Sequence, residues 1–393
     1  MKNEAWKIAH SSLQTYSMPS DPRFWIGFNI VKGIGPAKVR ALLDHFGDLE
    51  RAWGASAAEL KRIGFDKRSI KSFLATRDTL DLDAKVAELE QHGVRMVCWD
   101  SADYPAPLRH IPTSPPTLYI KGDLHESDRW AIAIVGTRKL TEYGRQITRE
   151  ITTGLVRRSI TIVSGLARGI DSIAHQVAVD MGGRTIAVLG SGIDQIYPPE
   201  NRRLAEKIAN GRGAIISEYA LGVPPEAKNF PPRNRIISAL SLGSAVIEAG
   251  YPSGALITAR FAAEQGRNIF AVPGNINSPA SKGTNKLIQE GAKLITSAKD
   301  ILDELQLEYV EEQQALQLSL PDSAEEAALV PHLINTPIHV DELSRATGLP
   351  AALVTSTLTM MELKGMVQQV GGMQYVLIRE MGTNYSIDKN EDQ

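Results

Sequence analysis

The sequence predicts an α/β protein built around a Rossmann-like parallel sheet core with helices on both faces. Six short apolar runs, rich in β-branched residues, recur within residues 131–274, and a helical stretch separates each run from the next. Near-continuous apolar strands that alternate with amphipathic helices are typical of a parallel sheet buried on both faces. Ligands of such sheets bind at the carboxyl ends of the strands, where this chain keeps its glycines and polar side chains.

The chain of 393 residues is long enough for two or three domains. Changes in composition, proline density and charge predict the boundaries. We expect a helical domain over 1–95, a proline-rich connection over 96–130, the sheet domain over 131–300, an acidic linker over 301–326, a winged-helix domain over 327–380 and a disordered tail over 381–393.

The N-terminal helices contain a glycine turn between Val31 and Pro36. Gly33 and Gly35 permit a close backbone approach, and Pro36 suits the first turn of a helix. The pattern resembles a helix-hairpin-helix element, in which the N–H groups of the turn can hold a DNA phosphate. We favour the other interpretation, a small helical domain packed for structural reasons, because such turns between helices are common.

The C-terminal segment predicts two helices followed by a hairpin, which is a winged-helix pattern. Such units often bind DNA through the second helix. Here that helix, residues 351–364, carries one lysine and no arginine. A helix that binds phosphates needs more positive charge, so we expect a protein-contact or regulatory role.

Charge is unevenly distributed along the chain. Residues 131–300 contain 21 Lys and Arg against 13 Asp and Glu, whereas residues 301–393 contain 4 against 15. A basic sheet domain favours an anionic partner, although an ordinary solvated surface also explains an excess of this size.

Several classes of protein are excluded by what the sequence lacks. No apolar run approaches the roughly 18 residues that a membrane span needs, and no signal-peptide pattern opens the chain. Cys98 is the only cysteine, so we expect no disulfide framework and no thiolate metal cluster. These observations predict a cytoplasmic protein with no membrane partner.

The sheet domain also lacks a catalytic constellation. It has no GK[ST] loop, no G-x-G-x-x-G dinucleotide spacing and no HExxH metal spacing. His175 has no Ser or Cys partner in the sequence, and lone histidines are usually structural. We therefore expect no cofactor, no metal ion and no enzymatic activity.

Two glycine-bearing loops follow the first two predicted strands of the sheet domain. In the loop from Ser164 to Asp171, Gly165 and Gly169 flank a turn before a helix N-terminus, which favours a phosphate cradle. A helix cap equally explains Asp171. Arg138 follows the first strand, where bidentate phosphate contact and an ordinary surface ion pair both account for it.

The segment from Lys228 to Arg235 is the most specific local signal. It places three cations and Phe230 within eight residues at a helix entrance. Phe230 precedes two prolines, so we expect an extended segment and an exposed ring. Single-strand binding without sequence preference uses an aromatic platform among cations. We favour this interpretation over the alternative, in which Phe230 belongs to the core and the arginines bind strand-end carbonyls.

Taken together, the motifs of the sheet domain resemble one family. They are GTR at 136, SGLARGIDSIAH at 164, LGSGID at 189, Tyr197-Pro198, SEY at 217, NFPPRNRIIS at 229, SGALITA at 253 and VPGNINSPASKGTN at 272. In this order across the whole domain they resemble the DNA-processing protein A (DprA/Smf) family. The flanking parts also fit its sterile-alpha-motif-like N-terminal and winged-helix C-terminal domains.

The resemblance implies a core that binds and protects single-stranded DNA, forms a homodimer and loads a RecA-type recombinase onto incoming strands. The implied setting is natural transformation and homologous recombination, and the family is not known as an enzyme. The DNA-binding residues that the motifs and the resemblance together predict are Gly136, Thr137, Arg138, Ser164, Gly165, Arg168, Lys228, Phe230, Arg233, Asn234 and Arg235.

Two other functions stay open. The glycine turns and Glu248 also resemble the phosphoribohydrolase fold, so a nucleotide-binding or nucleotide-hydrolysing enzyme is the alternative. Such an enzyme needs a PGGxGT-type loop followed by a glutamate, and the segment from Pro252 to Thr258 lacks both. The third possibility is an architectural dimer that bridges DNA without contacting a recombinase.

Overall fold

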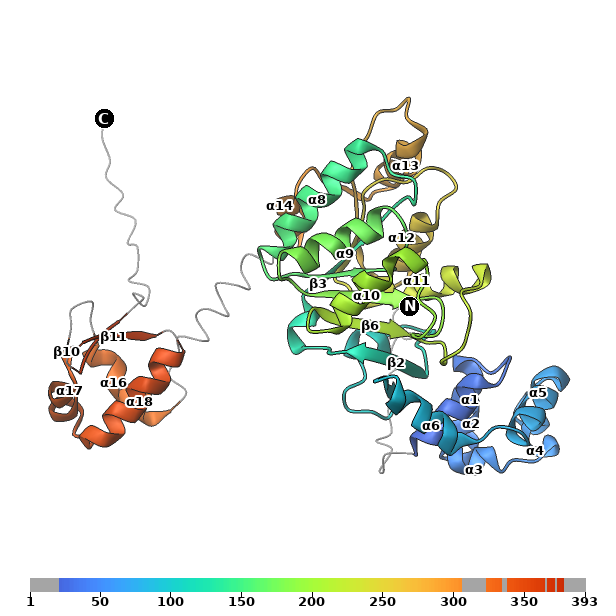
Figure 1. Cartoon of the computed structure of the whole chain (residues 1–393), viewed down its shortest axis with the longest axis horizontal. Coiled ribbons are helices and arrows are strands. Elements are labelled where there is room, and N and C mark those ends of the chain that lie inside the picture. Colours follow the sequence, from blue (N-terminus) through green and yellow to red (C-terminus); the bar gives the residue numbers. More distant parts are fainter. Residues whose placement is uncertain (1–20, 306–322, 334–337, 365, 372, 378–393) are drawn as a thin grey trace, which may run out of the picture. The chain divides into compact units, whose positions relative to one another are not determined.

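The computed structural model describes residues 21–305 and, beyond them, 323–333, 338–364, 366–371 and 373–377. The chain divides into two compact units, residues 1–301 and 302–393. Among the described residues, the first unit contains a nine-stranded sheet and the second a three-stranded sheet (Figure 1).

The large sheet is parallel except at one edge. In spatial order its strands are β1 (Arg95–Cys98), β2 (Thr117–Gly122), β6 (Gly213–Ser217), β5 (Thr185–Leu189), β4 (Thr161–Ser164), β3 (Ala131–Val135), β7 (Gly243–Val246), β8 (Asn268–Ala271) and β9 (Lys293–Leu294). The pairs from β6 to β9 are parallel, which confirms the predicted fold class. The chain runs outward from β3 to β6 and then adds β7 beside β3. This reversal is a topological switch point, where ligands of open α/β sheets bind.

Helices cover both faces of the sheet. α8 (Glu142–Val156), α9 (Ile170–Asp180) and α10 (Arg202–Ala209) pack side by side in front of it in Figure 1, and α11 (Phe230–Ala239) and α12 (Gly254–Glu264) pair on the opposite face. Alternate strand residues serve the two cores: Ile186 and Val188 pack toward α11, whereas Ala187 and Leu189 pack toward α10. Two further helices, α13 (Lys282–Gln289) and α14 (Ala298–Glu304), follow β8 and β9.

The segment 96–130, predicted as a connection, is instead an edge of the sheet. β1 pairs antiparallel with β2, and β2 pairs antiparallel with β6. A short helix, α7 (Ala106–Arg109), lies between β1 and β2 despite the density of proline. It forms because Pro105 precedes the helix and Pro107 occupies its first turn, where a missing N–H removes no helical hydrogen bond.

The described N-terminal residues form helices that turn in two successive hairpins. They are α1 (Pro22–Ile30), α2 (Pro36–Phe46), α3 (Leu49–Trp53), α4 (Ala57–Arg62), α5 (Lys67–Arg77) and α6 (Leu82–Gln91). The α1–α2 hairpin turns at Gly33 and the α4–α5 hairpin at Gly64, with φ of +88° and +87°. Both angles lie in the left-handed region that favours glycine.

These helices pack against the antiparallel edge of the sheet. The side-chain amide of Asn29 donates to the carbonyl of Glu218 at 3.0 Å and accepts from the hydroxyl of Tyr119 at 3.0 Å. Ile26 and Leu89 join the core formed by the sheet and α10. The predicted helical and sheet domains therefore lie in one compact unit.

The C-terminal unit confirms the predicted winged helix. Helices α16 (Ala324–Leu329), α17 (Val340–Thr347) and α18 (Ala351–Leu363) pack on a sheet whose order is β10 (Ile338–His339), β12 (Gln374–Leu377) and β11 (Val367–Gly371). The unit begins before the predicted boundary at residue 327, because α16 begins at Ala324 and its buried Glu326 pairs with Lys364 of the same unit. Residues 306–322 of the predicted linker and the predicted tail 381–393 lie outside the described residues.

Candidate functional site

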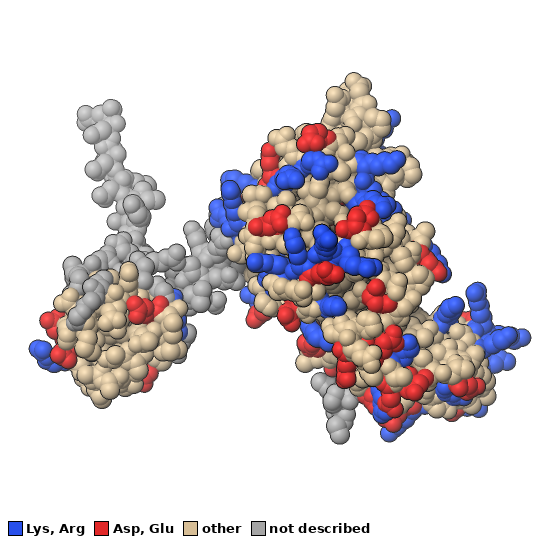
Figure 2. Space-filling view, viewed as in Figure 1, with Lys and Arg blue, Asp and Glu red and all other residues tan. Residues whose placement is uncertain are grey.

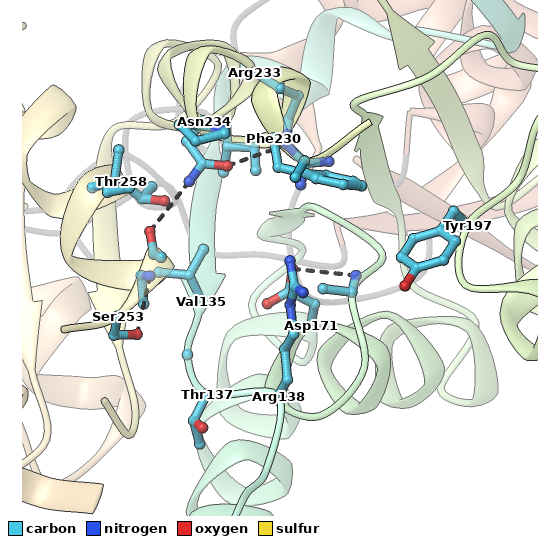
Figure 3. Close-up of a pocket in the computed structure, with 18 of the residues that line it drawn as sticks. Val135, Thr137, Arg138, Asp171, Tyr197, Phe230, Arg233, Asn234, Ser253 and Thr258 are labelled. Carbon is cyan, nitrogen blue, oxygen red and sulfur yellow. Dashed lines mark hydrogen bonds between the residues drawn. The ribbon is translucent and has the colours of Figure 1, made fainter. Parts of the chain in front are cut away.

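A pocket of about 670 Å³ opens at the carboxyl ends of the strands, across the switch point between β3 and β7. The loops after β3, β4, β5, β6 and β7 all contribute to its wall. Figure 3 shows Arg138, Tyr197 and Phe230 pointing into a common space from three of these segments, with Ser253 and Thr258 on the far side. Its lining includes Gly136, Thr137, Arg138, Asp171, Tyr197, Phe230, Arg233, Asn234, Ser253 and Thr258.

The loop after β3 is held in place from two sides. The Thr137 N–H donates to the carbonyl of Glu248 at 2.7 Å, and the Thr137 carbonyl accepts from the Ile170 N–H at 3.3 Å. Gly169 has a φ of +84°, and a Cβ there would lie 2.3 Å from the Thr137 oxygen. Only glycine permits this approach of two loops, which fixes the direction of Arg138.

Phe230 lies close to two guanidinium groups. The Cζ atom of Arg138 is 5.7 Å from the centre of the ring, and that of Arg233 is 5.8 Å away. The ring of Tyr197 lies 5.9 Å from that of Phe230, tilted by 43°. Arg138 is exposed, and no described residue forms a salt bridge with it. The cluster thus combines a half-buried aromatic face with the exposed cation of Arg138 at the mouth of the pocket.

Arg233 is a buried cation in the wall of the pocket, with 4% of its surface exposed. Its guanidinium donates to the carbonyl of Gly165 at 3.0 Å and also to the carbonyl of Val188. Burial lowers the pKa of Arg233 to about 10, against the opposing charge of Asp171. Arg233 is therefore still protonated at neutral pH and gives the wall a fixed positive charge.

The loop after β4 is occupied by a carboxylate of the chain itself. One Oδ of Asp171 accepts from the N–H groups of Gly165 and Ala167, at 3.1 and 3.4 Å. The loop is therefore not the open phosphate cradle that the sequence predicts. Burial raises the pKa of Asp171, while Arg233 and these N–H groups act in the opposite direction.

The far side of the pocket is polar and uncharged. The Asn234 amide donates to the carbonyl of Gly254 at 3.2 Å, and its oxygen accepts from the Arg233 guanidinium at 3.2 Å. Ser253 caps α12 by accepting from the Ala255 N–H at 3.3 Å. This side offers amide and hydroxyl groups to a ligand.

Comparison with known proteins identifies the family. The family model described as DNA recombination-mediator protein A matches residues 95–306, and the DprA winged helix domain matches residues 313–373. Protein Smf from Synechocystis sp. is 36% identical over 91% of this chain and 98% of its own length. Protein Smf from Escherichia coli is 39% identical over 82% of this chain and 87% of its own.

This chain belongs to the DNA recombination-mediator protein A family.

Two solved structures of family members share its fold. DNA processing protein A from Streptococcus pneumoniae is 34% identical, covers 73% of this chain and 99% of its own, and has a TM-score of 0.64. DNA processing protein A from Helicobacter pylori is 31% identical, covers 55% of this chain and 96% of its own, and has a TM-score of 0.50. The latter structure is described as revealing a unique single-stranded DNA binding mode.

Most of the residues expected from the family resemblance meet at the pocket, and three do not. Gly165 and Arg168 line a small adjoining hollow, together with Tyr197, Phe230 and Arg233. The residues outside both hollows are Ser164, Lys228 and Arg235.

Each of the three residues outside the pocket has another partner. The buried hydroxyl of Ser164 donates to the Ile134 carbonyl at 2.6 Å. Arg235 is buried and forms a bidentate pair with Glu218, at 2.6 and 2.7 Å. Lys228 is exposed outside the pocket and pairs with Glu226. Ser164 and Arg235 are thus buried and bonded within the chain in this structure, away from the pocket, and their contact with DNA stays a prediction.

Two further details differ from what the sequence predicts: the backbone conformation of Phe230 and the presence of Tyr197 in the pocket. Phe230 is helical (φ −70°, ψ −44°), not extended, because Pro231 and Pro232 occupy the first turn of α11. Sequence reasoning also missed Tyr197 as a candidate site residue. The signal in the sequence is the position of Tyr197 shortly after the LGSGID motif, which ends a predicted strand. The loops that follow neighbouring parallel strands meet at one edge of the sheet, so Tyr197 could have been expected there.

The described ranges contain neither a candidate metal cluster nor a membrane-spanning helix. No cluster of three or more His, Cys, Asp or Glu side chains there could hold a metal ion. No helix in the same ranges is long and apolar enough to cross a bilayer.

Proposed function

We propose that the protein binds single-stranded DNA at the carboxyl edge of its parallel sheet. The observation that carries the proposal is the half-buried Phe230 ring, with Arg138 and Arg233 beside it, at the mouth of a pocket. A base stacks on the ring while a phosphate meets Arg138, which is how proteins hold single strands without reading their sequence. Single-stranded DNA binding by the Helicobacter pylori relative supports the proposed class of ligand.

The arrangement favours single strands over duplexes for a physical reason. The bases of a duplex are stacked on one another, so their faces are not free to stack on Phe230. The exposed charge of Arg138 attracts either form through the backbone, whereas the aromatic contact rewards only an unstacked base.

Three ligands of equal length test the proposal. A single-stranded oligodeoxynucleotide, an abasic strand with the same phosphates, and a duplex are titrated against the protein at one salt concentration. We expect the abasic strand to bind more weakly, because stacking contributes about 1–3 kcal/mol per base. Equal affinity for the normal and abasic strands would refute an aromatic base platform.

The proposal extends to delivery of the bound strand to a RecA-type recombinase by a homodimer during DNA uptake and recombination. This part rests on the family resemblance. Its test is the DNA-dependent ATPase of RecA on a strand covered with single-strand-binding protein, with wild type and Arg138→Ala compared. Sedimentation velocity measures the oligomeric state. If wild type and Arg138→Ala stimulate the RecA ATPase equally, recombinase delivery does not depend on the pocket.

A mononucleotide is the competing ligand, because a volume of about 670 Å³ suits a small molecule. Glu248 is 3% exposed, and its carboxylate accepts from the N–H and hydroxyl of Thr141, at 2.9 and 2.7 Å. These bonds hold the start of α8. Incubation with AMP followed by chromatography tests hydrolysis, and release of adenine would displace the DNA-binding proposal.

A further inference from the structure

The tips of the N-terminal hairpins carry a cluster of cations that the sheet pocket does not use. Lys61 and Arg62 end α4, Lys67 and Arg68 begin α5, and Lys71 follows one turn later. All five side chains are exposed, and none forms a salt bridge with another described residue. Figure 2 shows Lys and Arg side chains projecting from the region where Figure 1 labels α4 and α5.

Part of this cluster is placed against helix stability. Lys61 and Arg62 suit the last turn of α4, but Lys67 and Arg68 occupy the first turn of α5, where the helix dipole disfavours cations and only the capping Asp66 supplies a carboxylate. Lys67 and Lys71 are like charges four residues apart on one helix face, which is also unfavourable. An ordinary solvated surface gains nothing from such clustering, whereas a polyanion bound to it turns the repulsion into attraction.

The two hairpin tips are fixed beside each other, so their charges add. The Lys38 ammonium donates to the carbonyl of Gly33 at 2.8 Å and to the carboxylate of Asp66 at 2.6 Å. The Ser69 hydroxyl contacts the same carbonyl at 3.3 Å. Hydrogen bonds from Lys38 and Ser69 hold the pKa of Asp66 well below its usual range. Lys32, exposed on the first tip, thereby lies on the same surface as the five cations.

This surface continues toward the sheet pocket. Lys228 lowers the pKa of Glu226 through a hydrogen bond, and the charge of Lys32 lowers it further. Lys32 therefore lies near the loop before α11, and Pro225 and Ala227 of that loop line the pocket. Lys32 thus stands at the end of this surface that faces the loop before α11, whose Lys228 is paired with Glu226.

The chemistry of the tips fits a phosphate backbone and not bases. Phe65, the aromatic residue between the cations of α4 and α5, is buried, so it offers no face for stacking. Lysine and arginine without aromatic partners give affinity that is independent of sequence and sensitive to salt.

We propose that Lys32, Lys61, Arg62, Lys67, Arg68 and Lys71 form a second nucleic-acid-binding surface. It holds the backbone of DNA that extends beyond the sheet pocket. The inference rests on the proposed function for the identity of the polyanion, but the two surfaces are tested separately.

The test compares two triple variants of the full chain on DNA of two lengths. The first variant is Lys67→Gln, Arg68→Gln and Lys71→Gln. The matched control removes three exposed cations, one on α8, one at its C-cap and one on α10: Arg149→Gln, Arg157→Gln and Lys207→Gln. One oligothymidylate of about 6 nucleotides, at the low end of single-strand site sizes, fills only the pocket. The other is several times longer.

On the long strand we expect the salt dependence of the first variant to become shallower by about 2 in log–log slope, from about 0.7 per lost contact. On the short strand its affinity matches that of wild type, and the control variant keeps the wild-type slope on both. An equal loss in the control would show general electrostatic attraction and overturn the proposal. No loss on the long strand, or the same loss on the short strand, would also overturn it.

The test of the second surface, called here the hairpin surface, does not depend on the pocket. Arg138→Ala probes the proposed function on the short strand, which is too short to reach the hairpin surface. If Arg138→Ala binds both strands normally while the hairpin variant loses affinity for the long one, the pocket assignment fails and the hairpin surface stands.

Discussion

Removal of the Arg138 guanidinium tests the pocket most directly. The side chain is exposed and forms no salt bridge with any described residue, so Arg138→Ala deletes a ligand contact without exposing a buried partner. One phosphate contact contributes about 0.7 to the log–log salt slope of single-strand binding. This contact is taken to contribute no affinity near 1 M salt, and each tenfold dilution of salt then strengthens it about 5-fold. The variant therefore binds about 5-fold more weakly than wild type at about 0.1 M salt and about 25-fold more weakly at about 0.01 M.

The assay is fluorescence anisotropy of a labelled oligothymidylate across a salt series, with thermal unfolding to confirm that the variant is folded. Arg149→Ala, an exposed arginine of α8, serves as the matched control and keeps the wild-type slope. Weakened binding with an unchanged slope would mean that Arg138 does not meet a phosphate. Unchanged binding at low salt would refute the assignment of DNA to this pocket.

Four further changes have distinct expected results. Phe230→Ala and Phe230→Leu weaken single-strand binding by about 5-fold to about 140-fold at an unchanged salt slope, because stacking and not charge is lost; a shallower slope would contradict this. Gly169→Ala lowers the melting temperature and the affinity together, since its Cβ would lie 2.3 Å from a carbonyl oxygen of the β3 loop; a variant with wild-type melting and affinity would refute the role of this approach. Glu218→Ala leaves Arg235 buried without its partner and costs about 3–5 kcal/mol in urea unfolding, while short-strand binding of the folded protein stays intact; a selective loss of DNA affinity would return Arg235 to the site. Burial and the charge of Arg233 lower the pKa of His175 from 6.5 to about 3, so the unfolded state binds the extra proton between these values and stability decreases as pH falls through this window. His175→Asn removes one proton from that pH dependence, and an unchanged slope would show that His175 does not cause it.

The sequence predicts the fold well because its signals are local. Apolar runs of strand length, glycines at strand ends and proline-bounded helices each specify an element without reference to distant residues. The same periodicity places the ligand site at the carboxyl edge, where the structure has its pocket. The antiparallel edge was harder to predict. Nothing within residues 96–130 shows that β2 pairs with β6, nearly a hundred residues later in the chain.

The site shows the same limit at the level of single side chains. The sequence groups Arg233 and Arg235 as neighbours in one basic cluster. In a helix, residues two apart point in different directions. Arg233 accordingly reaches the strand ends beside the pocket, while Arg235 pairs with Glu218 and donates to the Thr113 carbonyl at 2.8 Å.

By itself, the sequence determined the parallel sheet and the winged helix, and it predicted a ligand at the carboxyl edge together with Arg138 and Phe230, which the pocket brings together. Only the tertiary structure decided which polar groups are available to that ligand. Asp171 accepts hydrogen bonds from the loop that the sequence predicts as a phosphate cradle. Tyr197, in the loop after β5, lies beside Phe230 and extends the aromatic surface. Availability depends on partners that come from distant segments, and local patterns of residues carry no record of those partners.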